Sequence, residues 1–83
     1  MKRYRRLVFN FGYLPSQNEI IEFAEKILKN PHRERFVLYF VKNLTLDEIA
    51  KIENVSKSVI SRSIDSSLTV ARWYVETTNR IKS

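Results

Sequence analysis

Four polar side chains between residues 57 and 62 have the types and spacing needed to bind a polyanion. Lys57, Ser58, Ser61 and Arg62 recur at intervals of three and four residues, so a helix would place them on one face. Ammonium, hydroxyl and guanidinium groups donate hydrogen bonds to phosphate oxygens and to base edges. Val59 lies between them and belongs to the same candidate interface. The chemistry that this segment predicts is recognition of double-stranded DNA.

The sequence offers little for catalysis. An active site needs acid, base or nucleophilic groups that converge in a pocket. The chain has no Cys, and its one histidine, His32, has no neighbouring Cys or spaced acidic set that would bind a metal. The nine acidic residues fall mostly at expected helix starts and solvent faces, and no Gly-rich phosphate loop occurs. We therefore expect a binding protein and not an enzyme, with no cofactor, no metal and no small-molecule substrate.

The segment from 45 to 64 predicts two short helices joined by a tight turn, which is a helix-turn-helix. Thr45 and Glu48 have the spacing of a capping box at the start of the first helix. Ala50 is small enough to let the second helix cross closely over the first. Asn54 tolerates the left-handed conformation that ends a helix abruptly.

The second helix of this motif is expected to be long. Ser56 can cap it, and its inward stripe steps by three or four residues without Gly or Pro: Ile60, Ile64, Leu68, Ala71 and Val75. We therefore expect one helix to about Thr78, with the polar residues from 57 to 62 and Asp65 facing outward. The alternative interpretation of the same pattern is an ordinary helical hairpin whose polar face is exposed to solvent.

Two further helices are expected before the motif. Ser16 and Glu19 form a second capping box, which predicts a helix from Ser16 to Asn30. Asn30 and Pro31 then indicate a break and a new start, with a helix from Pro31 to about Lys42. That helix is apolar almost all round, so the core should be centred there. The prediction is an all-α, four-helix domain over residues 16–83.

Residues 1–15 are expected to form a basic and aromatic N-terminal arm. Arg3, Arg5 and Arg6 stand at its start, and apolar residues alternate after them. The alternation suits a short strand, but the chain has no second convincing strand to pair with it. We therefore expect an extended arm whose aromatic part packs on the domain or on a partner. Its basic tip could reach phosphates or a minor groove, and a disordered terminus is the alternative.

Charge and composition fit a soluble DNA-binding domain. The 83 residues carry a formal net charge of +6. The excess lies at the two ends: residues 1–15 hold four Lys or Arg and no acid, and residues 55–83 hold five basic residues against two acidic ones. Absence of Cys fits a reducing compartment. No apolar run approaches the roughly 20 residues of a membrane span, and residues 1–15 lack a signal-peptide core, so we expect a cytoplasmic protein.

Residues 31–72 resemble a known family. The stretches RERFVLYFVKNLTLDEIA (33–50) and VSKSVISR (55–62) look like region 4 of the sigma-70 family of bacterial sigma factors. The resemblance implies that Lys57, Ser58, Ser61 and Arg62 line the major groove of a promoter element and that Thr45 lies near backbone phosphate. It also implies contact with the flap of RNA polymerase, in a small phage or bacterial transcription regulator.

Three positions depart from the sigma pattern. Asn54 replaces the usual turn glycine, and Glu53 stands where an apolar residue is typical. Ser63 also replaces an apolar residue, with Ile64 one step later. The last two departures suggest a slightly rotated recognition helix.

Trp73 and Tyr74 fall outside the inward stripe of the long helix. Trp and Tyr are enriched at the energetic centres of protein interfaces, so we expect a protein contact here, either a homodimer or RNA polymerase. Packing within the domain is the alternative. A second hypothesis for the whole chain follows, in which it is a protein-interaction module that binds polymerase and does not itself read DNA.

Overall fold

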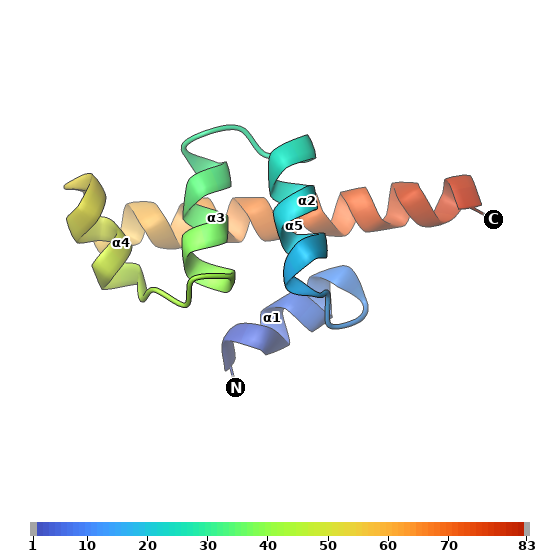
Figure 1. Ribbon diagram of the computed structural model, residues 1–83, viewed down its shortest axis with the longest axis horizontal. Helices are drawn as coiled ribbons and strands as arrows, with labels where there is room; N and C mark the ends of the chain where they lie inside the picture. Colours follow the sequence, from blue (N-terminus) through green and yellow to red (C-terminus); the bar gives the residue numbers. More distant parts are fainter. Residues whose placement is uncertain (1, 83) are drawn as a thin grey trace.

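The computed structural model describes residues 2–82, with side chains described for residues 3–78, and that part of the chain forms five α-helices and no strand. The helices are α1 (Lys2–Phe11), α2 (Gln17–Ile27), α3 (His32–Phe40), α4 (Leu46–Glu53) and α5 (Lys57–Lys82). The 26-residue α5 runs the length of the molecule, and α1, α3 and α4 each pack against it (Figure 1). The all-α class and the long C-terminal helix are confirmed, and α5 continues past the predicted end at Thr78.

The first predicted helix begins where its capping box places it and ends early. Glu19 N–H donates to Ser16 Oγ at 3.2 Å, and Ser16 N–H donates to the Glu19 carboxylate at 3.0 Å. The helix ends at Ile27, three residues before the predicted Asn30. Arg33 Nε donates to the backbone carbonyl of Leu28 at 2.9 Å, which satisfies an acceptor that the helix end leaves open. A side chain from α3 therefore stabilises this earlier end.

The next helix, α3, is shorter than predicted at both ends. It runs from His32 to Phe40, and the capping position is occupied by Pro31. Asn30 still acts near this helix start, because its Oδ1 accepts a hydrogen bond from Glu34 N–H at 3.3 Å. After the helix the chain turns sharply at Asn43, which has a φ of 61°.

The prediction that the core is centred on α3 is only partly met, because α3 contributes Phe36 and Phe40 while α2 and α5 supply more of the buried apolar side chains. Phe36 and Phe40 are almost fully buried, and their ring centroids lie 4.8 Å apart. Phe23 of α2 contacts Phe36 at 5.5 Å and Phe11 of α1 at 5.7 Å, both edge to face. A continuous row of aromatic rings therefore joins the first three helices.

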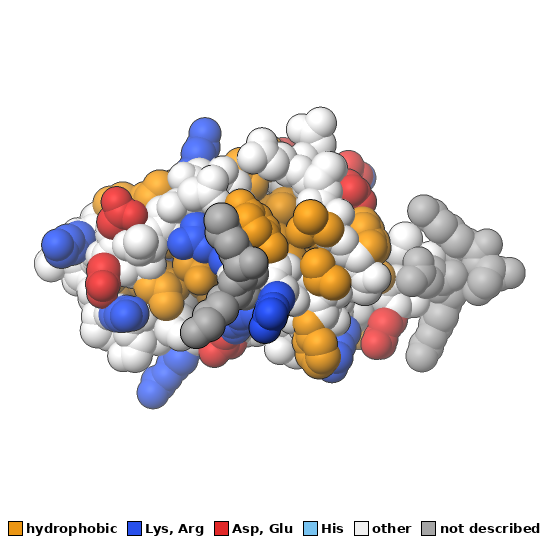
Figure 2. Space-filling view, turned by 90° about the horizontal axis from the view of Figure 1, so that it is seen from below, with side chains coloured by type: hydrophobic (Ala, Val, Ile, Leu, Met, Phe, Trp, Pro, Cys, Tyr) orange, Lys and Arg blue, Asp and Glu red, His pale blue; other side chains and the backbone are white. Residues whose placement is uncertain are grey.

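The N-terminal segment is a helix, so the prediction of an extended arm is wrong. Leu7 and Phe11 are four residues apart and both are buried, which is the spacing of one helical face. The helix ends at Phe11, and the next residue, Gly12, has a φ of +84°, which suits a residue without a Cβ. The alternating pattern misled because Phe9, which a strand would place beside Leu7, is 70% exposed on the outer side of α1. Apolar side chains are visible on the face that carries α1 (Figure 2).

The buried stripe of α5 follows the sequence prediction from Ile60 to Ala71, whereas Val75, the last predicted member, is only partly buried. Ile60, Ile64 and Ala71 have no exposed surface, and Leu68 is 2% exposed. Leu7 and Phe11 of α1 belong to the same buried cluster. The domain boundary between residues 15 and 16 stays a prediction. Within residues 2–82, none of the helices has the length and apolar character that a membrane span requires.

Candidate nucleic-acid interface

The first helix of the motif, α4, is fixed at its start by the predicted capping box. Glu48 N–H donates to Thr45 Oγ1 at 3.1 Å, and Thr45 N–H donates to Glu48 Oε1 at 2.8 Å. The hydrogen bond from the Thr45 N–H to the carboxylate, with a smaller contribution from the Thr45 side chain, holds the pKa of Glu48 below its usual value. The Thr45 hydroxyl is thus occupied within the chain, at an exposed position on the molecular surface.

The turn between α4 and α5 has the predicted geometry. Asn54 adopts the left-handed conformation, with φ of 57° and ψ of 46°. Val55 N–H donates to the carbonyl of Ala50 at 3.0 Å, and Asn54 N–H donates to the carbonyl of Lys51 at 3.3 Å. This pair of bonds is a Schellman motif, in which Asn54 takes the position that glycine usually occupies. Ala50 is buried where α4 contacts α5.

The first two turns of α5 present the predicted face. Ile60 and Ile64 point into the core, and the side chains of Lys57, Ser58 and Arg62 are exposed. Val59 is 40% exposed and Ser61 is partly exposed. We call Lys57, Ser58, Val59, Ser61 and Arg62 the recognition surface.

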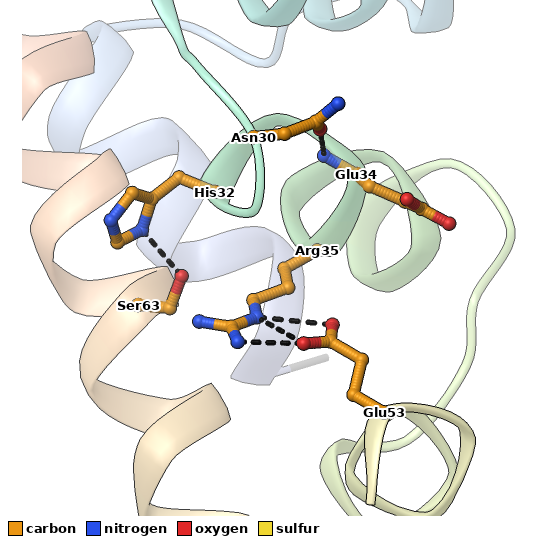
Figure 3. Close-up of polar contacts among 6 residues, drawn as sticks. All are labelled: Asn30, His32, Glu34, Arg35, Glu53 and Ser63. Carbon is orange, nitrogen blue, oxygen red and sulfur yellow. Dashed lines mark hydrogen bonds and ion pairs between the residues drawn. The ribbon is translucent and has the colours of Figure 1, made fainter. Parts of the chain in front are cut away.

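An ion pair that sequence reasoning missed connects α3 to the end of α4. Arg35 Nη2 donates to Glu53 Oε1 at 2.6 Å, and Arg35 Nε donates to Oε2 at 3.0 Å (Figure 3). Their side chains are only 10% and 24% exposed. The hydrogen bonds to Glu53 raise the pKa of the Arg35 guanidinium. A bidentate pair of this kind fixes orientation as well as distance, and here it acts on the residue just before the turn.

A second polar contact connects α3 to α5. His32 Nδ1 lies 2.6 Å from the hydroxyl of Ser63, which is buried (Figure 3). The hydroxyl of the buried Ser67 donates to the backbone carbonyl of Ser63 at 2.9 Å. Glu53 and Ser63, which depart from the sigma pattern, thus both find partners on α3. The partners Arg35 and His32 are three residues apart, which is one turn of that helix. The only sign of these two contacts in the sequence was that Glu53 and Ser63 are polar residues at positions where the sigma pattern has apolar ones.

The three arginines assigned to the N-terminal arm lie in different environments. Arg3 Nη1 donates to the carbonyl of Tyr39 at 2.9 Å, and its guanidinium stacks over the Tyr39 ring. Arg6 forms an ion pair with Asp65 on the outer side of α5. Arg5 is exposed. Two of the three arginines therefore hold α1 in place against α3 and α5.

The two aromatic residues assigned to a protein interface are separated by the fold. Tyr74 packs within the domain, with its ring centroid 5.3 Å from that of Phe23. Trp73 is 59% exposed. Packing within the domain therefore describes Tyr74, and an exposed position describes Trp73. A contact with a partner protein remains a prediction.

A cavity of about 240 Å³ brings Tyr13 together with Glu19 and Glu22. Each carboxylate there has a structural partner: Tyr13 donates to Glu19 at 2.6 Å, and Lys26 pairs with Glu22 at 2.7 Å. The hydrogen bond to Glu19, aided by burial, raises the pKa of Tyr13 to about 12. Among the described side chains, no cluster of three or more His, Asp or Glu residues is placed to hold a metal ion.

The comparisons with known proteins bear on the same segment. A family model described as "Putative helix-turn-helix protein, YlxM / p13 like" matches residues 15–78, which include α2, α3 and the whole motif. Neither the curated proteins nor the solved structures contain a match to this chain. The matched residues make up most of the sequence, and the fold contains the predicted motif. The chain therefore belongs to this YlxM/p13-like helix-turn-helix family.

Proposed function

We propose that the protein is a sequence-specific regulator of transcription that binds double-stranded DNA and inserts the start of α5 into the major groove. The observation that carries the proposal is the recognition surface. Its polar and cationic side chains are exposed, while Ile60 and Ile64 of the same two turns are fully buried. Such a helix enters a major groove with its first turns toward the bases.

Electrostatics supports a nucleic-acid partner. The chain carries a formal net charge of +6, and Lys57 and Arg62 are exposed on the recognition surface. Asp65 is the nearest acidic residue along the helix, and Arg6 of α1 pairs with it. That pairing offsets a negative charge which would otherwise face the phosphates.

Lys57 and Arg62 should contribute in different ways. Arg62 is one turn into the helix, where a guanidinium can make a bidentate contact to guanine, so Arg62→Ala should cost about 1–3 kcal/mol on the preferred site only. Lys57 starts the helix and is expected to contact phosphate. Lys57→Ala should therefore weaken binding to all sequences and lower the salt slope by about one unit.

A fluorescence anisotropy titration against a selected site and against random duplex, repeated at several salt concentrations, tests these roles. Lys29→Ala, which changes an exposed lysine in the loop after α2, is the matched control and should leave both affinities unchanged. The proposal fails if wild-type protein has no affinity for either duplex. The assignment of roles fails if each variant loses as much affinity for random DNA as for the selected site.

A partner for α5 is the second element of the proposal, and exposure of Trp73 favours it. A single helix-turn-helix reads few base pairs, so a homodimer or RNA polymerase would add the affinity that one module lacks. The resemblance to sigma region 4 supports polymerase. Sedimentation of the protein alone and with polymerase, for wild type and Trp73→Ala, separates the two partners. A wild-type monomer that does not bind polymerase would refute both.

A further inference from the structure

The outer side of α1 carries an apolar groove that the recognition of DNA does not use. It has a volume of about 550 Å³ and is lined by Tyr4, Arg5, Val8, Phe9 and Leu14. Phe9 is 70% exposed and Leu14 is 59% exposed, although both are large apolar side chains. Grouped exposure of this kind marks a binding surface more often than scattered single residues do.

The groove is framed by positive charge. Arg5 lines it, and the guanidinium of Arg72 from α5 lies 4.7 Å from the centroid of the Phe9 ring. No acidic residue precedes Glu19 in the sequence, so α1 and the loop after it have no carboxylate of their own. The hydroxyl of Tyr4 already donates to Asn43, which leaves its ring as the part facing the groove.

We propose that this groove binds an acidic amphipathic helix of another protein. An apolar ridge on that helix would pack between Val8, Phe9 and Leu14, and its flanking carboxylates would pair with Arg5 and Arg72. α1 meets α5 at Asp65 and Arg72, which follow the recognition surface along the helix. DNA and the acidic helix would therefore bind at separate places, and the inference stands or falls independently of DNA binding.

A second copy of the chain and an anionic membrane are less suitable occupants. Two copies that met through the same groove would bring like-charged arginines together, which opposes association. A membrane-binding helix buries a broad apolar face in lipid. In α1 the apolar residues Leu7 and Phe11 are already buried against the domain, which leaves a narrow groove better matched to the side chains of a helix.

The test uses the full chain and a labelled synthetic peptide of about 20 residues, with Leu along one helical face and Glu elsewhere. Fluorescence anisotropy should show binding that weakens as salt is added. Phe9→Gln should weaken it about tenfold, because the variant removes the most exposed apolar contact. Ile52→Gln, which changes a similarly exposed apolar residue on α4, should leave binding unchanged. Both variants should keep the circular dichroism spectrum and melting curve of wild type.

Two control peptides and two further assays complete the test. A peptide with Lys in place of Glu, and one whose Leu residues are scattered over all faces, should both fail to bind. The inference is overturned if the acidic peptide does not bind, if Phe9→Gln binds it like wild type, or if the Lys peptide binds equally. It is also overturned if the protein sediments as a dimer that Phe9→Gln dissociates. Flotation with phosphatidylglycerol vesicles that depends on Phe9 would assign the groove to a membrane instead.

Discussion

The recognition surface and the α1 groove are both cationic and both exposed, yet the fold supports them in different ways. The inner side of the recognition surface is buried through Ile60 and Ile64. Two polar contacts from α3 are added to this burial, the largely buried Arg35–Glu53 pair and the His32–Ser63 contact. The inner side of α1 is likewise buried through Leu7 and Phe11, but its ion pair, between Arg6 and Asp65, is exposed on the surface. A bidentate hydrogen-bonded pair is directional, whereas the hydrophobic effect that drives apolar burial is not.

The difference matches what each surface is proposed to bind. Reading base edges requires donors placed accurately, because a shifted helix would miss its hydrogen-bond partners. An apolar groove that accepts another helix tolerates small displacements. The comparison teaches that polar residues at normally apolar positions of this motif act as orienting contacts, and that α1 serves mainly to complete the core.

The largest loss of stability is expected from Leu7→Ala, which removes a buried apolar side chain of α1. Leu7 is fully buried, and leucine-to-alanine changes in cores cost about 2–5 kcal/mol. Urea denaturation should show this loss. DNA affinity measured below the melting transition should stay near that of wild type, since the contacts from α3 are intact. A loss of affinity in a fully folded Leu7→Ala protein would show that α1 also orients the recognition helix.

A smaller loss of stability is expected from Glu53→Ala, which removes the carboxylate of the Arg35–Glu53 pair. It leaves the Arg35 guanidinium largely buried without its carboxylate, and since the pair is partly accessible we expect a cost of about 2–3 kcal/mol. Here DNA affinity should fall even when the protein is folded, because the end of α4 is no longer fixed.

The double variant Arg35→Met with Glu53→Leu sharpens this test. Replacing a buried pair by apolar side chains often restores stability. If the pair serves to orient the end of α4, the free energy of unfolding should return close to that of wild type while DNA affinity stays reduced. Full recovery of both properties would mean that the pair contributes only to stability.

The smallest effect is expected from Thr45→Ala, at about 1 kcal/mol for loss of a helix cap. The pKa of Glu48 is lowered in the folded protein, so the stability from this ionised carboxylate is present above its unfolded pKa and is lost as pH falls through its folded pKa. Thr45→Ala should bring the Glu48 pKa closer to its ordinary value in an NMR titration. Ser16→Ala, in the matching capping box of α2, is the control and should leave the Glu48 pKa unchanged.

The sequence by itself determined the features that depend on local chemistry. Both capping boxes, the left-handed turn at Asn54 and the inward stripe of α5 from Ile60 to Ala71 follow from hydrogen bonds and side-chain spacing within a few residues, and the structure contains all of them. The same spacing placed Lys57, Ser58 and Arg62 on an exposed face.

Only the tertiary structure decided the contacts between distant segments. Apolar alternation from Leu7 onward fits a strand or a helix, and burial of Leu7 and Phe11 in the shared core selects the helix. Glu53 and Ser63 were visible as departures from a pattern, but their partners stand 18 and 31 residues earlier. No local rule joins residues so far apart, because their meeting depends on how α3 packs across α4 and α5.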